Sequence, residues 1–131
     1  MALREQGTDR EIESWYPPQP QSVRAARRAL SSVLQERGLD VHDATLLVSE
    51  LASNAVEHAR TPFVVTVRIG SALRVEVADE SDLLPVITNP RAHSERGRGL
   101  AVVRAMSSRW GVEFCRTGKA VWFELPLTPA G

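Results

Sequence analysis

The sequence predicts an α+β protein: a two-layer sandwich in which three helices cover one face of a mixed, mostly antiparallel sheet. Two observations favour this class. Three segments carry the apolar spacing of amphipathic helices, and the strand-like segments occur as hairpin pairs rather than as single strands between helices. Helices and hairpins that are kept apart along the chain are typical of an α+β sandwich rather than of a parallel sheet.

The chain has 131 residues, a length that suits one compact domain with one core. Residues 1–11 are polar and show no periodic pattern, so we expect a flexible N-terminus there. We expect a single domain over residues 12–127 and a short tail over 128–131. No internal repeat and no second domain are visible in the sequence.

Two helices are expected in the first half of the chain. The first begins at Ser22 as N-cap and ends at Gly38 as the C′ residue. The second begins after Asp40 and runs to about Ala59, before Thr61-Pro62. Their expected core faces are Val23, Ala26, Leu30, Val33 and Leu34 in the first helix, and Ala44, Leu47, Val48, Leu51 and Ala55 in the second.

Alternating residues predict the strands. A short strand is expected at 13–16, followed by a hairpin of 63–69 and 72–79 around Gly70-Ser71. Residues 80–96 have no periodicity, and so long a loop is typical of a functional lid or a disordered segment. A third helix is expected after Gly99, with Leu100, Val103, Ser107 and Trp110 on one face and Gly111 closing it, and a last hairpin follows around Thr117-Gly118.

Composition excludes several classes of function. The 16 basic and 16 acidic residues cancel, so there is no electrostatic footprint of a nucleic-acid-binding protein. There is neither a secretory leader nor an apolar run of about 20 residues that could span a membrane. The single cysteine, Cys115, cannot form an internal disulfide. These features predict a cytoplasmic protein without direct nucleic-acid or membrane partners.

Only one of the 16 basic residues is a lysine, Lys119; the other 15 are arginine. One interpretation is a coding bias that replaces lysine with arginine wherever either residue serves. The other is that position 119 requires a compact ammonium instead of a planar guanidinium.

Polar residues at intervals of four border the core of the second helix, at Glu50, Asn54 and His58. Residues i and i+4 are neighbours on a helix surface, so the three side chains share one edge. The Asn54 amide oxygen could coordinate Mg²⁺, and Glu50 could accept a proton from an attacking hydroxyl or water. The alternative is a hydrated polar flank without chemistry.

Two further features could bind a ligand. Gly97-Arg98-Gly99, preceded by Arg96, opens a helix, and a helix N-terminus with close backbone approach suits a phosphate. It could equally be a flexible joint, and it is neither a Walker A nor a Rossmann motif. Asp79 ends a strand, where it could be a turn former or an acceptor for an amino group such as that of adenine.

The order of these motifs resembles a known family. The pattern E-L-x-x-N-A-x-x-H stands at Glu50 to His58, and Asp79 and then G-R-G-L at Gly97 to Leu100 follow it. Together they resemble the Bergerat-type ATP-binding fold of the GHKL proteins, which include gyrase, the heat-shock chaperone, histidine kinases and MutL. The stretch RWGVEFCRTGKAVWFELPL is similar to the C-terminal hairpin of the stand-alone anti-sigma-factor serine/threonine kinases, and the resemblance covers about residues 11–127.

The resemblance implies roles for the candidate residues. Asn54 would coordinate Mg²⁺ at the phosphates of ATP, and Glu50 would be the general base. Asp79 would bind the adenine amine, and Lys119 would be a weaker candidate for a nucleotide or structural contact. The phosphate and lid region would comprise Arg96, Gly97, Arg98, Gly99 and Leu100.

One motif departs from the family pattern. The adenine motif is commonly D-x-G-x-G, whereas this chain has Asp79-Glu80-Ser81-Asp82-Leu83, without either glycine. Two functions therefore stay open. The first is an anti-sigma-type regulator that uses Mg-ATP to phosphorylate serine or threonine on an anti-anti-sigma-type partner. Its expected partners are a sigma factor, an anti-anti-sigma-type protein or both, with pairing into a homodimer carried over from relatives. The second is a protein-interaction module with degenerate or absent nucleotide binding. The catalytic domain of a histidine kinase is disfavoured, because no helical hairpin with a phosphoacceptor histidine precedes the domain.

Overall fold

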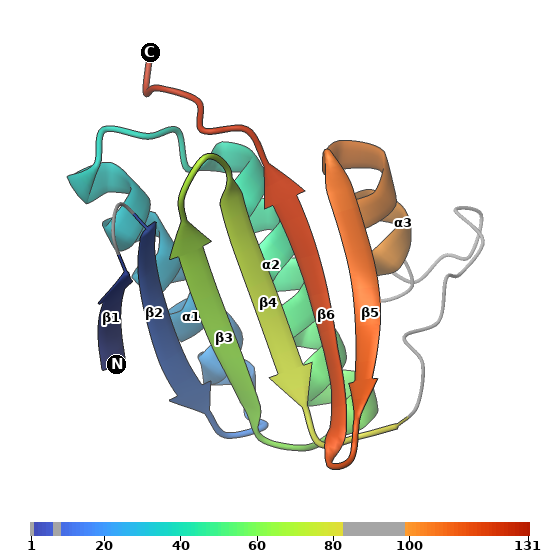
Figure 1. Ribbon diagram of the computed structural model, residues 1–131. Helices are drawn as coiled ribbons and strands as arrows, with labels where there is room; N and C mark the ends of the chain where they lie inside the picture. The colour runs from blue at the N-terminus through green and yellow to red at the C-terminus, as the bar shows by residue number, and fades with distance from the viewer. Residues whose placement is uncertain (1, 7–8, 83–98) are drawn as a thin grey trace.

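The computed structural model describes residues 2–6, 9–82 and 99–131 (Figure 1). Within these residues, six strands form one sheet in the order β1-β2-β3-β4-β6-β5, and every neighbouring pair is antiparallel. The strands are β1 (Ala2–Gln6), β2 (Asp9–Tyr16), β3 (Phe63–Ile69), β4 (Leu73–Asp79), β5 (Arg109–Cys115) and β6 (Gly118–Leu125). The predicted α+β sandwich is confirmed, with a sheet that is antiparallel throughout these strands.

Three helices lie on one face of this sheet, as Figure 1 shows. They are α1 (Pro20–Glu36), α2 (His42–Asn54) and α3 (Gly99–Met106). Helix α2 contacts α1, α3 and β4, so it is the central element of the helical layer. No helix in the described ranges is long and apolar enough to cross a membrane.

The core lies between the two layers and follows the predicted periodicity. The expected face of α2 is buried, with Ala52 in addition, and so is that of α1 apart from Val23, which is only partly buried. Alternate residues of β3, β4 and β6 meet these helices, and Val75 and Phe123 are completely inaccessible. Burying each such large apolar side chain contributes about 1.5–3 kcal/mol, so this layer supplies most of the favourable free energy of folding.

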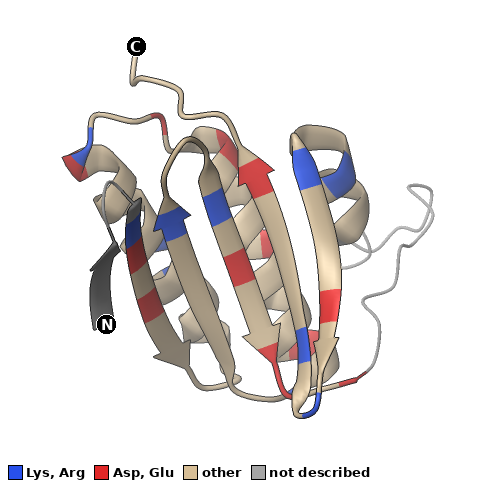
Figure 2. Ribbon diagram, viewed as in Figure 1, with Lys and Arg blue, Asp and Glu red and all other residues tan. Residues whose placement is uncertain are grey.

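Figure 2 shows charged residues of both signs interleaved along the strands, and the alternating burial of β4 places Arg74 and Glu76 on the face of the sheet opposite the helices. Arg74 is central to it: its guanidinium lies 3.9 Å from the Trp122 ring centroid and bonds the carboxylates of Glu76 and Glu124 at 3.0 and 3.2 Å. Burial alone lowers the pKa of Arg74, but these hydrogen bonds outweigh burial and raise it above the ordinary arginine value. Arg74, Glu76 and Glu124 therefore form a linked ion-pair network on this face.

The N-terminal expectation is wrong in part. Residues 2–6 form β1 and pair with β2, which begins at Asp9 rather than at residue 13. An edge strand is held by backbone hydrogen bonds, so it requires no apolar periodicity that sequence inspection could detect. The predicted tail is also bound, because the Asp40 N–H donates to the Thr128 carbonyl at 2.7 Å and the Ala130 N–H to the Gly38 carbonyl at 2.8 Å.

Helix boundaries and turns differ in smaller ways. Helix α1 begins at Pro20, and Ser22 is not its N-cap but donates its hydroxyl to the Pro17 carbonyl at 2.7 Å. Proline suits the first helical position because its fixed φ is helical and its missing N–H is not needed there. Gly38 does adopt the left-handed conformation expected after a helix, with φ of 69°. In the first hairpin Ile69 pairs with Leu73, so that loop has a third residue, Ala72.

The third helix is shorter than predicted. It ends at Met106, and Trp110 and Gly111 lie in β5. The Ser107 hydroxyl donates to the Val103 carbonyl at 2.6 Å at the end of the helix. The next residue already joins the sheet, because the Ser108 N–H donates to the Glu124 carbonyl of β6 at 2.9 Å. The apolar residues near Trp110 fit a helical and an alternating pattern equally well, and pairing with β6 decides between them.

Candidate functional site

The candidate residues come from four elements, of which α2 contacts both α3 and β4, and β4 pairs with β6. Glu50 and Asn54 lie in the C-terminal half of α2, Asp79 ends β4, Lys119 is near the start of β6, and Gly99 opens α3. Figure 1 shows that the end of α2, the end of β4 and the start of β6 all lie toward the same end of the sheet. Antiparallel pairing explains part of this, because Asp79 and Lys119 are direct cross-strand partners.

Glu50 and Asn54 are one turn apart on α2, and both are partly buried. Their neighbours Leu51 and Ala55 are fully in the core, so the two polar side chains lie at the border between core and surface. That border is where the sequence predicted them. An amide and a carboxylate in this position can reach a ligand without losing the rigid support of the helix.

The helix changes geometry directly after Asn54. Residues Ala55–Ala59 form a π-helix, η1, in which the Arg60 N–H donates to the Ala55 carbonyl at 2.8 Å. Its wider turn interrupts the spacing by four, and His58 is exposed instead of continuing the edge. The predicted helix end at Ala59 is thus confirmed in position but not in type. Short π-helical turns inside helices are frequent at functional sites.

Asp79 and Lys119 form a buried ion pair. The Lys119 ammonium lies 2.9 Å from each carboxylate oxygen of Asp79 and 3.3 Å from the Ser81 carbonyl oxygen. Their side chains retain only 4% and 7% of their accessible surface, for lysine and aspartate respectively. The only lysine of the chain thus meets three acceptors in a confined space, which supports the interpretation that position 119 requires a compact ammonium.

Gly118 allows this pair to form. Its φ is 153°, and a β-carbon built there would overlap the Asp79 carbonyl oxygen and lie 2.7 Å from the Glu80 α-carbon. The start of β6 therefore packs directly on the backbone of the corner at residues 79–80. Sequence inspection placed Gly118 in a turn, but pairing of Cys115 with Gly118 puts it in the strand. No sequence signal indicated this close backbone contact.

The glycine-led motif is described only in part. Arg96, Gly97 and Arg98 lie outside the described residues, as do residues 83–95 of the predicted lid. Gly99 is the first residue of α3. Leu100 is buried in the core at 3% exposure, so in the described structure it anchors α3 rather than presenting a surface to solvent.

Among the candidate residues, Asn54 offers an amide oxygen that could serve as a magnesium ligand. Within residues 10–82 and 100–131, no group of three or more histidine, cysteine, aspartate or glutamate side chains gathers in a way that could hold a metal. Mg²⁺ commonly takes only one or two protein ligands and completes its shell with phosphate oxygens and water. A single amide oxygen from Asn54 is compatible with that pattern.

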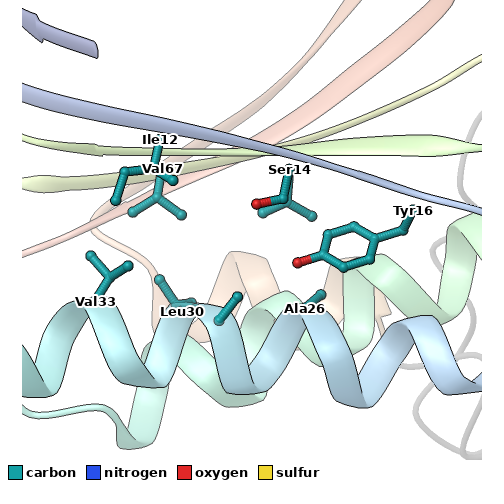
Figure 3. Close-up of a pocket in the computed structure, with 9 residues that line it drawn as sticks. Ile12, Ser14, Tyr16, Ala26, Leu30, Val33 and Val67 are labelled. Carbon is teal, nitrogen blue, oxygen red and sulfur yellow. The ribbon is translucent and has the colours of Figure 1, made fainter. Parts of the chain in front are cut away.

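A separate small hollow lies between α1 and strands β2 and β3 (Figure 3). Its lining is mostly apolar, and the hydroxyls of Ser14 and Tyr16 point toward it. The Tyr16 ring stacks on Phe63 with ring centroids 5.3 Å apart. None of the motif residues lines this hollow, so it is distinct from the candidate site.

The fold and the placement of its polar residues define an α+β domain whose helical layer and sheet together hold a polar site at one end. A family model described as "Histidine kinase-like ATPase domain" matches residues 16–125, and the chain belongs to that family. This agrees with the resemblance inferred from the motif order. Comparison with curated protein sequences finds no significant match.

Among solved structures, the chain is similar to "The crystal structure of the RsbU and RsbW domains of Rv1364c from Mycobacterium tuberculosis". The TM-score is 0.70 and the sequence identity 21%, over 89% of this chain. The match spans only 32% of the other chain. At that identity the similarity supports the fold.

Proposed function

We propose that the protein is an ATP-binding regulator of the anti-sigma type, which uses Mg-ATP to phosphorylate serine or threonine on an anti-anti-sigma-type partner in the cytoplasm. The family and the motif order support ATP as the ligand. The single observation that carries the proposal is the meeting of α2, β4 and β6 at one end of the sheet, with Asn54, Asp79 and Lys119 on these three elements.

Each residue has a distinct role in this proposal. Asn54 holds Mg²⁺ at the phosphates, and Asp79 accepts a hydrogen bond from the adenine amine. Glu50 accepts the proton of the partner's hydroxyl. ATP supplies the phosphoryl group, and transfer from it depends chiefly on positioning and charge neutralisation. Arg96, Gly97 and Arg98 remain candidates for the phosphate region from their sequence alone.

Replacing Asn54 with alanine tests the first requirement, nucleotide binding. We expect Mg-ATP affinity to fall about ten- to a hundredfold, because a lost hydrogen bond or ligand contact to a charged group costs roughly 1.5–3 kcal/mol. Isothermal titration calorimetry with Mg-ATP measures the change. Repeating the titration in EDTA should reduce the difference between wild type and variant, since Asn54 acts through the metal.

His58→Ala is the matched control, because His58 belongs to the same motif but is exposed on η1. Its Mg-ATP affinity should stay within about twofold of wild type, as for most surface substitutions. Equal loss in both variants would show that the end of α2 had been disturbed in general, and would count against a metal role for Asn54.

Two observations favour a second function. Lys119 contacts both carboxylate oxygens of Asp79, and Ser81 stands where the family motif commonly has glycine. A protein-interaction module with degenerate nucleotide binding would tolerate both features. Calorimetry separates the two functions, because absence of any wild-type heat with Mg-ATP and with Mg-ADP supports the interaction module.

A further inference from the structure

The hydrogen bonds of Lys119 account for all of its donors. An ammonium has three N–H groups, and Lys119 has three acceptors: both oxygens of Asp79 and the Ser81 carbonyl. Its side chain is 4% exposed. Lys119 therefore has no donor left for a phosphate, and its direct role is toward Asp79 and the chain that follows it.

The acceptors of Asp79 are nearly all occupied as well. A carboxylate has about four lone-pair positions, two on each oxygen. Oδ1 accepts from Lys119 and from the Ser81 N–H at 2.9 Å, whereas Oδ2 accepts from Lys119. Within the described residues this leaves one acceptor position, on Oδ2. Gly118 packs on the backbone of the same corner and holds its position.

We propose that Lys119 is a positioning residue that sets the base specificity of the site. By occupying three acceptors of the corner formed by Asp79 and Ser81, it directs the remaining lone pair of Oδ2 toward an amino group. The site then favours a purine with an exocyclic amine over one without it. This inference rests on the proposed function, because it assumes that a nucleotide base meets Asp79.

The opposite role is that Lys119 plugs the site by competing with the base for Asp79. The two roles predict opposite effects when Lys119 loses its donors. Lys119→Met keeps a flexible chain of similar size but removes the ammonium. If Lys119 positions Asp79, this variant should bind ATP more weakly than wild type. If Lys119 instead competes with the base for Asp79, the variant should bind ATP more tightly.

The test compares two ligands in each protein by calorimetry: Mg-ATP, and the Mg complex of the analogue whose exocyclic amine is replaced by hydrogen. We expect wild type to prefer ATP by about tenfold, the effect of one hydrogen bond to a charged group. In Lys119→Met the preference should fall to about twofold or less. The ratio of the two affinities does not depend on how much protein is folded, so a merely structural role would leave it unchanged.

Two further variants complete the design. Lys119→Arg keeps the positive charge, so it covers the case in which Lys119→Met does not fold; its planar fork cannot reproduce the ammonium contacts, and the preference should fall here also. Arg74→Met is the matched control, since it removes a cation from an ion-pair network on the opposite face of the same sheet. It should keep the full preference for ATP.

The possible outcomes distinguish failure of the positioning role from failure of the proposed ATP-binding function. Suppose that wild type binds ATP. If a folded Lys119 variant then keeps the full preference for ATP, or binds ATP more tightly than wild type, the positioning role is overturned and the proposed function is left intact. Wild type that binds ATP without any preference for the amine also overturns it. If wild type and Lys119→Met both bind neither nucleotide, the proposed function itself fails and the inference fails with it.

Discussion

Gly118→Ala is expected to lower the free energy of unfolding by about 3 kcal/mol or more, the upper range for inserting atoms into a packed interior. The new β-carbon would overlap the Asp79 carbonyl oxygen, and that neighbour is backbone, which cannot move aside as a flexible side chain could. The φ of 153° adds strain for any residue with a β-carbon. Urea denaturation followed by circular dichroism measures the loss.

Two other glycines provide a graded control. Gly38 has a φ of 69° but nothing within 4 Å of the position that a β-carbon would take, so Gly38→Ala should cost only about 1 kcal/mol for its backbone conformation. Gly131 has neither constraint, and Gly131→Ala should be neutral within about 0.5 kcal/mol. Gly118→Ala with a loss no greater than that of Gly38→Ala would contradict the close contact between β6 and the corner at residues 79–80.

Glu50→Gln should reduce phosphoryl transfer by about a hundredfold to ten-thousandfold, the usual contribution of a positioned general base. Glutamine has nearly the same size and helix propensity but cannot accept the proton of a hydroxyl. Mg-ATP affinity should stay within about threefold of wild type, because in the proposed mechanism Glu50 acts on the partner's hydroxyl rather than on the nucleotide. Transfer of ³²P from labelled ATP to an anti-anti-sigma-type protein of the same organism measures the rate, and calorimetry measures the affinity.

Glu57→Gln is the matched carboxylate control. Glu57 is also partly buried and lies two turns further along, in η1. Its rate of transfer should remain near that of wild type. Equal rates for wild type and Glu50→Gln would exclude Glu50 as the base. Wild type that binds Mg-ATP but transfers no label to any such partner would contradict the kinase proposal and favour the interaction module.

Much of the fold could be predicted from the sequence, because burying one face of a helix or strand makes apolar residues recur at a fixed spacing. The buried face that runs from Ala44 in α2 to Ala55 at the start of η1 shows the helical period, and β3 and β4 show alternation, so these core faces were predicted correctly. Predictions failed where pairing rather than burial decides the structure. Strand β1 is held by backbone hydrogen bonds to β2, which leave no apolar pattern in the sequence, and at the start of β5 the apolar residues fit two patterns until pairing with β6 decides between them.

The candidate site divides in the same way. Spacing by four on a helix was enough to place Glu50 and Asn54 on one edge, because helix geometry is local. It did not predict the change to a π-helix after Asn54, which separates His58 from that edge.

The sequence by itself determined the fold class, the core faces of the helices and the identity of the unusual residues, including the only lysine. Only the tertiary structure decided what that lysine does, because Asp79 and Lys119 are 40 residues apart and meet through the register of β4 and β6. Register depends on pairing along whole strands, so no local pattern contains it. The same pairing places Gly118 on the Asp79 backbone, and the geometry of the candidate base site follows from that contact.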